Sequence, residues 1–110
     1  MGRQSVSIDP LRSLAFGSIT NSYAKVGTAL VEPVRLIAFD NPTDGDMLVS
    51  TDGSTDMLFL AAGTFKLFDL TTNKLSIDTQ WVFNVGTQFY VKYSSAPSKS
   101  AFYIACLWGQ

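Results

Sequence analysis

The sequence predicts an all-β fold, a single antiparallel β-sandwich or jelly roll of about eight strands with an extended N-terminal arm. Short apolar runs alternate with clusters of turn residues from residue 34 onward, which is typical of antiparallel strands. No stretch keeps a 3.6-residue apolar period over three turns, so we expect little or no helix. A chain of 110 residues with 46% hydrophobic residues forms one domain with its own core.

The first segment, residues 1–12, is polar and is interrupted by Pro10. We interpret it as an N-terminal arm, flexible or laid on a neighbouring molecule, and we assign residues 13–110 to the β-sandwich domain. A first short strand is predicted over residues 11–16, where the arm meets the domain. Residues 17–27 are rich in Ser, Thr, Asn and Gly and predict a loop with a weak strand inside it.

From residue 34 the strand pattern is stronger. Pro33 stands in front of the run 34–40, where its missing N–H is tolerated. Because side chains alternate along a strand, Leu36 and Ala38 point to one face and Ile37 and Phe39 to the other. Both faces therefore carry apolar groups, and we expect this strand to be covered on most of both sides.

Turn signals divide the rest of the chain. Residues 41–46 contain Asn-Pro and Asp-Gly, Asp52-Gly53 is the strongest hairpin signal, and Ala62-Gly63 marks a further turn. Polar loops are predicted over residues 71–74 and 94–100. The strands predicted between these turns span residues 47–51, 56–61, 64–70, 74–78, 79–85, 88–93 and 101–108.

Composition narrows the class of partner. Eight basic and nine acidic residues are scattered along the chain and give a net charge of −1, so we expect neither nucleic acid nor a membrane surface as partner. Only 15% of the residues are charged, against about 25% in typical domains. A small domain of this kind either hides apolar surface against a protein partner or is simply well filled, and the sequence leaves both interpretations open.

The sequence contains few residues of the kinds that catalyse reactions. The chain has no His, its single cysteine, Cys106, lies in an apolar run and is expected to be buried, and no nucleophile or phosphate-binding motif occurs. Asp69 and Asp78 lie in strand-like runs, so one of them is a candidate buried carboxylate. We predict a protein that is not an enzyme, with no catalytic, cofactor-binding or metal-binding residues and no cofactor.

The sequence leaves open whether two acidic loops bind a metal ion. Asp40, Asp44 and Asp46 place carboxylate oxygens within seven residues, a donor type that suits calcium. Turn chemistry explains the same residues, because Asp and Asn side chains cap turns, and it is the preferred interpretation. The loop that begins at Asp52 and ends at Asp56 is interpreted in the same way.

The C-terminal third is rich in aromatic residues, which either fill the core or form a strip that binds sugar or protein. Those at positions 90 and 93, and those at positions 102 and 103, are expected on opposite faces of their strands. The residues are Trp81, Phe83, Phe89, Tyr90, Tyr93, Phe102, Tyr103 and Trp108.

The order of strands and turns resembles small virion proteins of short-tailed bacteriophages. The resemblance runs through Asn41–Asp46, Ser50–Asp56, Ala62-Gly63 and Asp69–Asn73, and extends over residues 86–109. Among such proteins it is most similar to capsid decoration, or cement, proteins.

That resemblance implies a structural protein of the capsid surface, made in the host cytoplasm. Its expected partner is the major capsid protein, whose neighbouring subunits it would hold together, and it is expected to be a homo-oligomer on the lattice. The resemblance transfers no individual site residue. Two alternatives stay open: a head–tail connector, collar or tail component, and a carbohydrate- or receptor-binding module.

Overall fold

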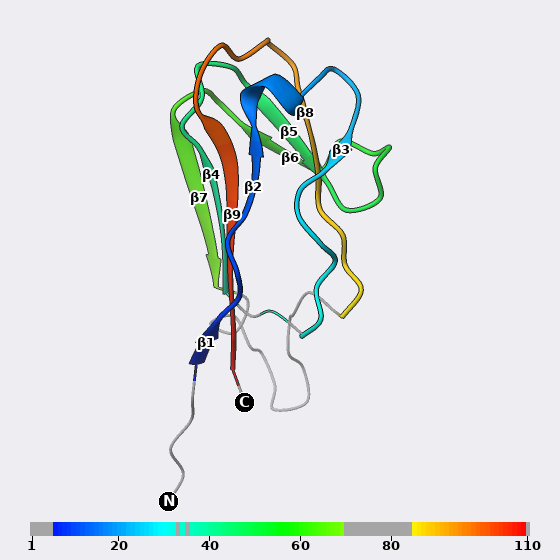
Figure 1. The fold of residues 1–110 in the computed structure, drawn as a ribbon, viewed down its shortest axis with the longest axis vertical. Helices are drawn as coiled ribbons and strands as arrows, with labels where there is room; N and C mark the ends of the chain where they lie inside the picture. Colours follow the sequence, from blue (N-terminus) through cyan, green and yellow to red (C-terminus); the bar gives the residue numbers. More distant parts are fainter. Residues whose placement is uncertain (1–5, 33, 35, 70–84, 110) are drawn as a thin grey trace, which may run out of the picture.

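The computed structural model describes residues 6–32, 34, 36–69 and 85–109. Two antiparallel sheets pack face to face as a β-sandwich (Figure 1). The described helical structure consists of a single 3-10 turn, η1 (Phe16–Ser18). The predicted all-β sandwich with almost no helix is therefore confirmed.

Sheet A is built around the longest described strand. Strands β1 (Val6–Ile8) and β2 (Arg12–Ala15) both pair with the same edge of β9 (Ala101–Gly109). On the other side, β9 pairs with β4 (Leu36–Asn41), which pairs in turn with β7 (Thr64–Asp69). Because β1 and β2 follow one another along one edge, sheet A is four strands wide.

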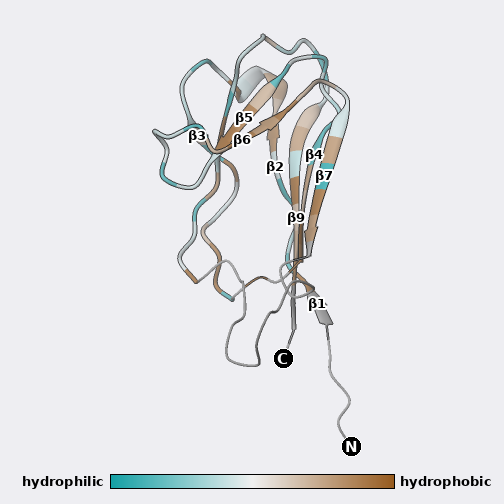
Figure 2. Cartoon of the chain, turned by 180° about the vertical axis from the view of Figure 1, so that it is seen from behind, coloured by the Kyte–Doolittle hydropathy of each residue, from teal (hydrophilic) through white to brown (hydrophobic). Residues whose placement is uncertain are grey.

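Sheet B has the order β3-β8-β5-β6. The short strand β3 (Ala24–Lys25) pairs with β8 (Tyr90–Tyr93), and β8 pairs with β5 (Met47–Ser50). Strand β6 (Leu58–Leu60) completes the sheet. Hydrophobic residues run along the strands of both sheets (Figure 2).

The core lies between the two sheets. Phe39 of β4 packs edge-to-face on Phe89, which precedes β8, with ring centroids 5.9 Å apart. The expected alternation places Phe102 inside and Tyr103 outside, and Cys106 is fully buried on β9 as predicted. The buried apolar residues are Ile19, Val26, Leu30, Val34, Ile37, Phe39, Met47, Val49, Leu60, Phe89, Val91, Phe102, Ile104 and Cys106.

The predicted turns that fall on described residues lie where the sequence indicates, with one difference in length. Asp52-Gly53 does connect two paired strands, but through the longer loop 51–57 rather than a two-residue turn. Gly53 has φ +79° and Gly63 has φ +72°, a region that glycine enters without strain. At Gly63 the chain passes from β6 of sheet B to β7 of sheet A, so that turn joins the two layers.

The strand predicted over residues 34–40 is covered less evenly than expected. Ile37 and Phe39 are buried between the sheets, but Leu36 and Ala38 are only half-buried and Asp40 is exposed. The expectation of cover on both sides was wrong for the outer side. The strand predicted at 74–78, residues 79–84 of the strand predicted at 79–85, the turn at 71–74, and residues 1–5 of the predicted arm lie outside the described residues. Val85, the last residue of the second strand, lies in a turn.

The described part of the arm follows the edge of β9. After β1, the backbone N–H of Asp9 donates to the carbonyl of Cys106 at 2.9 Å. The Asp9 carboxylate then pairs with the Arg12 guanidinium at 2.9 Å, and both side chains are buried. This ion pair lies at the step between β1 and β2.

Candidate docking surface

The outward side of sheet A is mostly apolar. Strand register aligns its side chains in rows across the sheet: Leu107 of β9 is opposite Leu36 of β4, and Ala38 of β4 is opposite Leu67 of β7. Their sequence neighbours, such as Ile37 and Cys106, point into the core, so these residues point outward. The outer face of sheet A comprises Ile8, Leu11, Ser13, Leu36, Ala38, Asp40, Phe65, Leu67, Tyr103, Ala105 and Leu107.

Several of these side chains are widely exposed. The exposed fractions are 76% for Ile8, 60% for Leu11, 61% for Phe65 and 56% for Leu67. Scattered apolar residues on a surface need no explanation, but a contiguous apolar sheet face marks a contact site. With strands about 4.8 Å apart, a four-stranded face three side-chain rows long covers about 400 Å². That area is about half of the 800 Å² that each partner contributes to a standard interface.

The centre of this face is hollowed. Asp40 lies directly opposite Tyr103 on one neighbouring strand and Phe65 on the other. The small side chains of Ala38 and Ala105 form the adjoining row, and the depression has a volume of about 420 Å³. Leu11 completes its lining. The hollow therefore combines aromatic and aliphatic walls with one carboxylate.

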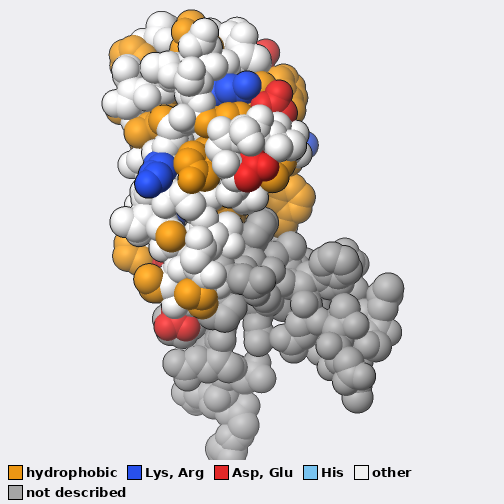
Figure 3. Space-filling view, turned by 90° about the vertical axis from the view of Figure 1, so that its right-hand side faces the viewer, with side chains coloured by type: hydrophobic (Ala, Val, Ile, Leu, Met, Phe, Trp, Pro, Cys, Tyr) orange, Lys and Arg blue, Asp and Glu red, His pale blue; other side chains and the backbone are white. Residues whose placement is uncertain are grey.

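The outward side of sheet B has a different character. Lys25, Leu48, Lys92 and Phe59 point outward there, and the loop 51–57 adds Asp52 and Asp56. Figure 3 shows basic and acidic side chains interspersed with polar and hydrophobic groups on the side of the molecule where sheet B lies. A mixed-charge surface is what a protein presents to water. The two outer faces thus differ, and sheet A has the one suited to contact.

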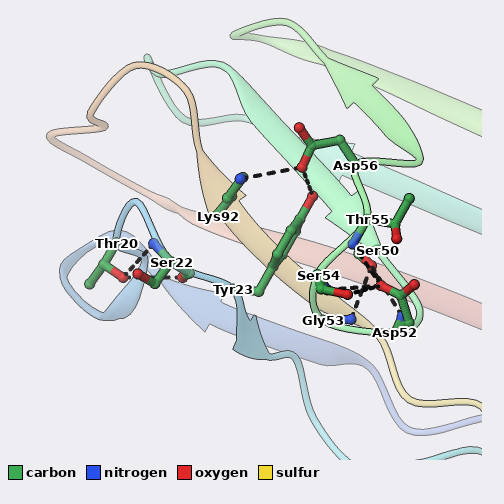
Figure 4. A network of polar contacts seen from close by, with 10 residues as sticks. All are labelled: Thr20, Ser22, Tyr23, Ser50, Asp52, Gly53, Ser54, Thr55, Asp56 and Lys92. Carbon is green, nitrogen blue, oxygen red and sulfur yellow. Dashed lines mark hydrogen bonds and ion pairs between the residues drawn. The ribbon is translucent and has the colours of Figure 1, made fainter.

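A compact polar cluster lies on the sheet B side (Figure 4). The Tyr23 hydroxyl donates to the Asp56 carboxylate at 2.6 Å, and Lys92 Nζ lies 3.3 Å from the same oxygen and 4.7 Å from the Tyr23 ring centroid. Burial and the bond to Asp56 raise the pKa of Tyr23, while that bond and Lys92 lower the pKa of Asp56. Every member has a partner within the cluster, so it fastens the 51–57 loop to strand β8 and to Tyr23 beside β3.

The loop after β5 is organised by one carboxylate. Asp52 Oδ1 accepts the backbone N–H groups of Ser54 and Thr55, each at 2.8 Å, and the Ser50 hydroxyl at 2.8 Å. These bonds, led by those from Thr55 and Ser54, hold the pKa of Asp52 well below its ordinary value of 3.8. The preferred interpretation of this loop as turn chemistry fits the geometry.

We expect the free energy of unfolding to fall in acid because of such carboxylates. A group whose folded-state pKa is lowered stabilises the fold above its unfolded pKa, near 3.8 for Asp52, and loses that contribution as pH falls toward the folded pKa. Denaturant titrations between about pH 6 and pH 2 should show the decline, and Asp52→Asn should make it shallower. Ser54→Ala removes only a long contact of 3.4 Å between the Ser54 hydroxyl and Asp52 and keeps the carboxylate and the backbone donors, so it should leave the slope nearly unchanged. An Asp52→Asn slope equal to that of the wild type would contradict this assignment.

Asp44 and Asp46 bond to different loops, and Asp40 lies apart from both. Asp44 accepts the backbone N–H of Ser98 at 2.7 Å and also its hydroxyl, which lowers the pKa of Asp44. Asp46 Oδ1 accepts the N–H of Ala62 at 2.9 Å, and Asp40 is on the outer face of sheet A. Among the described residues, no three acidic, Cys or His side chains come together as a group that could hold a metal ion. The two bonded carboxylates tie neighbouring loops together.

The remaining candidate residues from the sequence do not come together in one site among the described residues. Cys106 is enclosed, and burial raises the pKa of its thiol to about 11, so the thiolate is scarce at neutral pH. Asp78 and the side chain of Asp69 lie outside the described residues, as do Trp81, Phe83 and the side chain of Trp108.

The aromatic residues of the C-terminal third do not form one strip among those described. Phe89 and Phe102 are fully buried and Tyr93 packs against the core. Tyr90 points outward from sheet B, whereas Tyr103 points outward from sheet A. A second hollow of about 250 Å³ opens between the sheets beside Phe39 and Phe68, and Met57 contributes to its apolar lining.

Comparison of the chain with protein-family models, curated proteins and solved structures finds no match. Within the described residues, no helix has the length and apolar character needed to cross a membrane. The outer face of sheet A was missed at the sequence level. Its signal was present in the runs 34–40, 64–70 and 101–108, which carry apolar side chains at consecutive positions, but the alignment of those side chains into rows depends on strand register.

Proposed function

We propose that this chain is a non-enzymatic structural protein of a bacteriophage particle, which binds the outer capsid lattice and stabilises contacts between major capsid subunits. The observation that carries the proposal is the apolar outer face of sheet A, opposite a sheet B face with ordinary mixed charge. Together with the resemblance of residues 41–73 and 86–109 to decoration proteins, this surface favours a role in protein–protein contact.

The size of the face fits a protein that acts in many copies. An apolar contact of about 400 Å² is small for a lasting complex between two free molecules. A capsid lattice presents the same site repeatedly at fixed spacing, so a decoration protein that contacts several subunits gains strength through multivalency. The resemblance implies the major capsid protein as partner and a homo-oligomer on the lattice.

Binding to capsids tests the proposal directly. Purified chain is mixed with phage particles that lack it, and bound chain is measured after sedimentation. We expect saturable binding at a copy number equal to that of the major capsid protein or a simple fraction of it. Leu67→Asp should weaken binding by at least about 10-fold, because it places a charge on the apolar outer face of sheet A. Lys25→Asp, a charge change on the exposed side of sheet B, is the matched control and should bind normally.

The stoichiometry distinguishes the alternatives. About a dozen copies per particle would assign the chain to the connector, collar or tail instead. Absence from particles, together with no binding to them, would overturn the virion proposal. A screen against glycans would then test the carbohydrate-binding alternative.

A further inference from the structure

We propose that the hollow in the outer face of sheet A receives an arginine or lysine side chain of the partner protein, with Asp40 as its counter-ion. This inference deepens the proposed function and rests on it for the identity of the partner, but the chemistry of the hollow is argued separately. The occupant is a different protein surface with a basic side chain, and not a second copy of this chain.

The lining of the hollow suits a long side chain with a cationic end. Ala38 and Ala105 leave room above one row of the sheet, and Phe65 and Tyr103 stand on either side of Asp40 in the next row. Arginine and lysine carry an apolar stem and a charged head, so the stem can lie over the alanines while the head meets the carboxylate. The neighbouring aromatic rings add a favourable surface for a cation.

Asp40 needs such a partner if this face is covered. The ion pairs in the described part of the chain are Arg12–Asp9 and Lys92–Asp56, so Asp40 has no cation there. The carboxylate is exposed to water in the free protein. Covering it with an apolar partner would remove that water and leave an unpaired buried charge, which is strongly unfavourable. A partner with a basic side chain at this point avoids the penalty.

The same charge argues against self-association through this face. Its described residues include Asp40 but neither Lys nor Arg, so two copies stacked face to face would bring two carboxylates into an apolar interface with no cation between them. Asp40 therefore acts as a specificity device, because it disfavours a second copy and favours a basic partner.

The test uses a probe that does not depend on capsids. Isotope-labelled full-length chain is titrated with Nα-acetyl-arginine methylamide, with the citrulline analogue as neutral isostere, and followed by NMR. We expect saturable shifts at Asp40, Ala105 and Tyr103, with affinity for the arginine compound at least about 10-fold above that for citrulline. Asp40→Asn should abolish the difference, and Asp44→Asn, outside the hollow, should preserve it. Equal shifts with both compounds, or shifts at Asp56 or Asp44 instead, would overturn the inference.

Capsid binding and sedimentation velocity then test the role of Asp40 in the complex and whether the chain associates with itself. Asp40→Lys should weaken capsid binding by at least about 30-fold. If Leu67→Asp impairs binding and Asp40→Lys does not, the chain binds capsids through the outer face of sheet A, but the proposal of a basic side chain in the hollow is wrong. If the wild type binds no capsids but selects arginine, the proposed function fails and the hollow stands. Wild-type dimers that Leu67→Asp dissociates would overturn the choice of a different protein as occupant.

Discussion

Replacing Arg12 with methionine should lower the free energy of unfolding by about 3–5 kcal/mol, because it leaves a buried carboxylate without its counter-ion. Arg12 Nη1 lies 2.9 Å from Asp9 Oδ2, and Nε donates to the carbonyl of Thr28 at 2.9 Å. Arg12 and Asp9 are only 6% and 7% exposed. The same side chain thus joins the step between β1 and β2 to the loop that follows β3. Urea unfolding at pH 7, followed by fluorescence, measures the loss.

A double-mutant cycle separates the ion pair from the packing of the arginine stem. Asp9→Leu combined with Arg12→Met removes both charges and should recover a large part of the stability lost in Arg12→Met alone. Lys66→Met, at an exposed position on β7, is the control and should change stability by less than about 0.5 kcal/mol. If the double variant were as unstable as the sum of the two single variants, the ion pair would not be the cause.

Gly27 shows how closely the chain packs around this arginine. A Cβ atom at Gly27 would lie 2.5 Å from Cγ of Arg12, and the residue has φ +66°. Both facts require glycine here, the first because the arginine stem occupies the space and the second because side chains disfavour this backbone conformation. The loop after β3 can therefore lie against the stem only without a side chain at position 27.

Alternating apolar residues and turn chemistry were sufficient to predict the layers of this fold. Strands β5, β7, β8 and β9 lie at the runs predicted over 47–51, 64–70, 88–93 and 101–108, because those runs are short, rich in β-branched and aromatic residues, and bounded by turn residues such as Gly, Pro, Asn or Asp. The length of each strand was less predictable. β3 contains only two residues, since its pairing with β8 ends where the chain turns away.

The candidate site depends on information that local patterns do not contain. The run 34–40 indicates that both sides of the strand are apolar, but not that Ala38 lies between Ala105 and Leu67, or Asp40 between Tyr103 and Phe65. That alignment follows from register, which contacts between distant segments determine. Asp40 also appears in sequence as one of a group of acidic turn residues, and only the register separates it from Asp44 and Asp46.

The burial of Asp9 and Arg12 could not be predicted from the sequence for a related reason. In the sequence they belong to a polar segment around Pro10, which predicts an arm that is flexible or laid on a neighbouring molecule. In the structure they are buried together, because each charge satisfies the other and the guanidinium also donates to the carbonyls of Thr28 and Pro10. Polarity alone therefore predicts exposure only for side chains that lack such partners.

Asn41→Leu should destabilise the protein by about 3 kcal/mol or more, although leucine has a similar size. Asn41 is fully buried at the end of β4. Its Nδ2 donates to the carbonyls of Gly45 at 2.9 Å and Leu60 at 3.1 Å, and its Oδ1 accepts the Thr43 hydroxyl at 2.6 Å. Leucine would leave these buried groups without partners, and each such group costs about 1–3 kcal/mol.

Two further variants make the measurement specific. Thr43→Val removes one hydroxyl from the same network and should cost less, about 1–2 kcal/mol, because Asn41 keeps its bonds to the carbonyls of Gly45 and Leu60. Asn21→Leu, at an exposed loop position, is the matched control and should change stability by less than about 0.5 kcal/mol. Asn41, at the end of β4 in sheet A, bonds both to the 42–46 connection between the sheets and to the end of β6 in sheet B, so its loss should also raise amide exchange rates at Gly45 and Ala61. Unchanged exchange at both positions would show that the two sheets are joined there by other contacts.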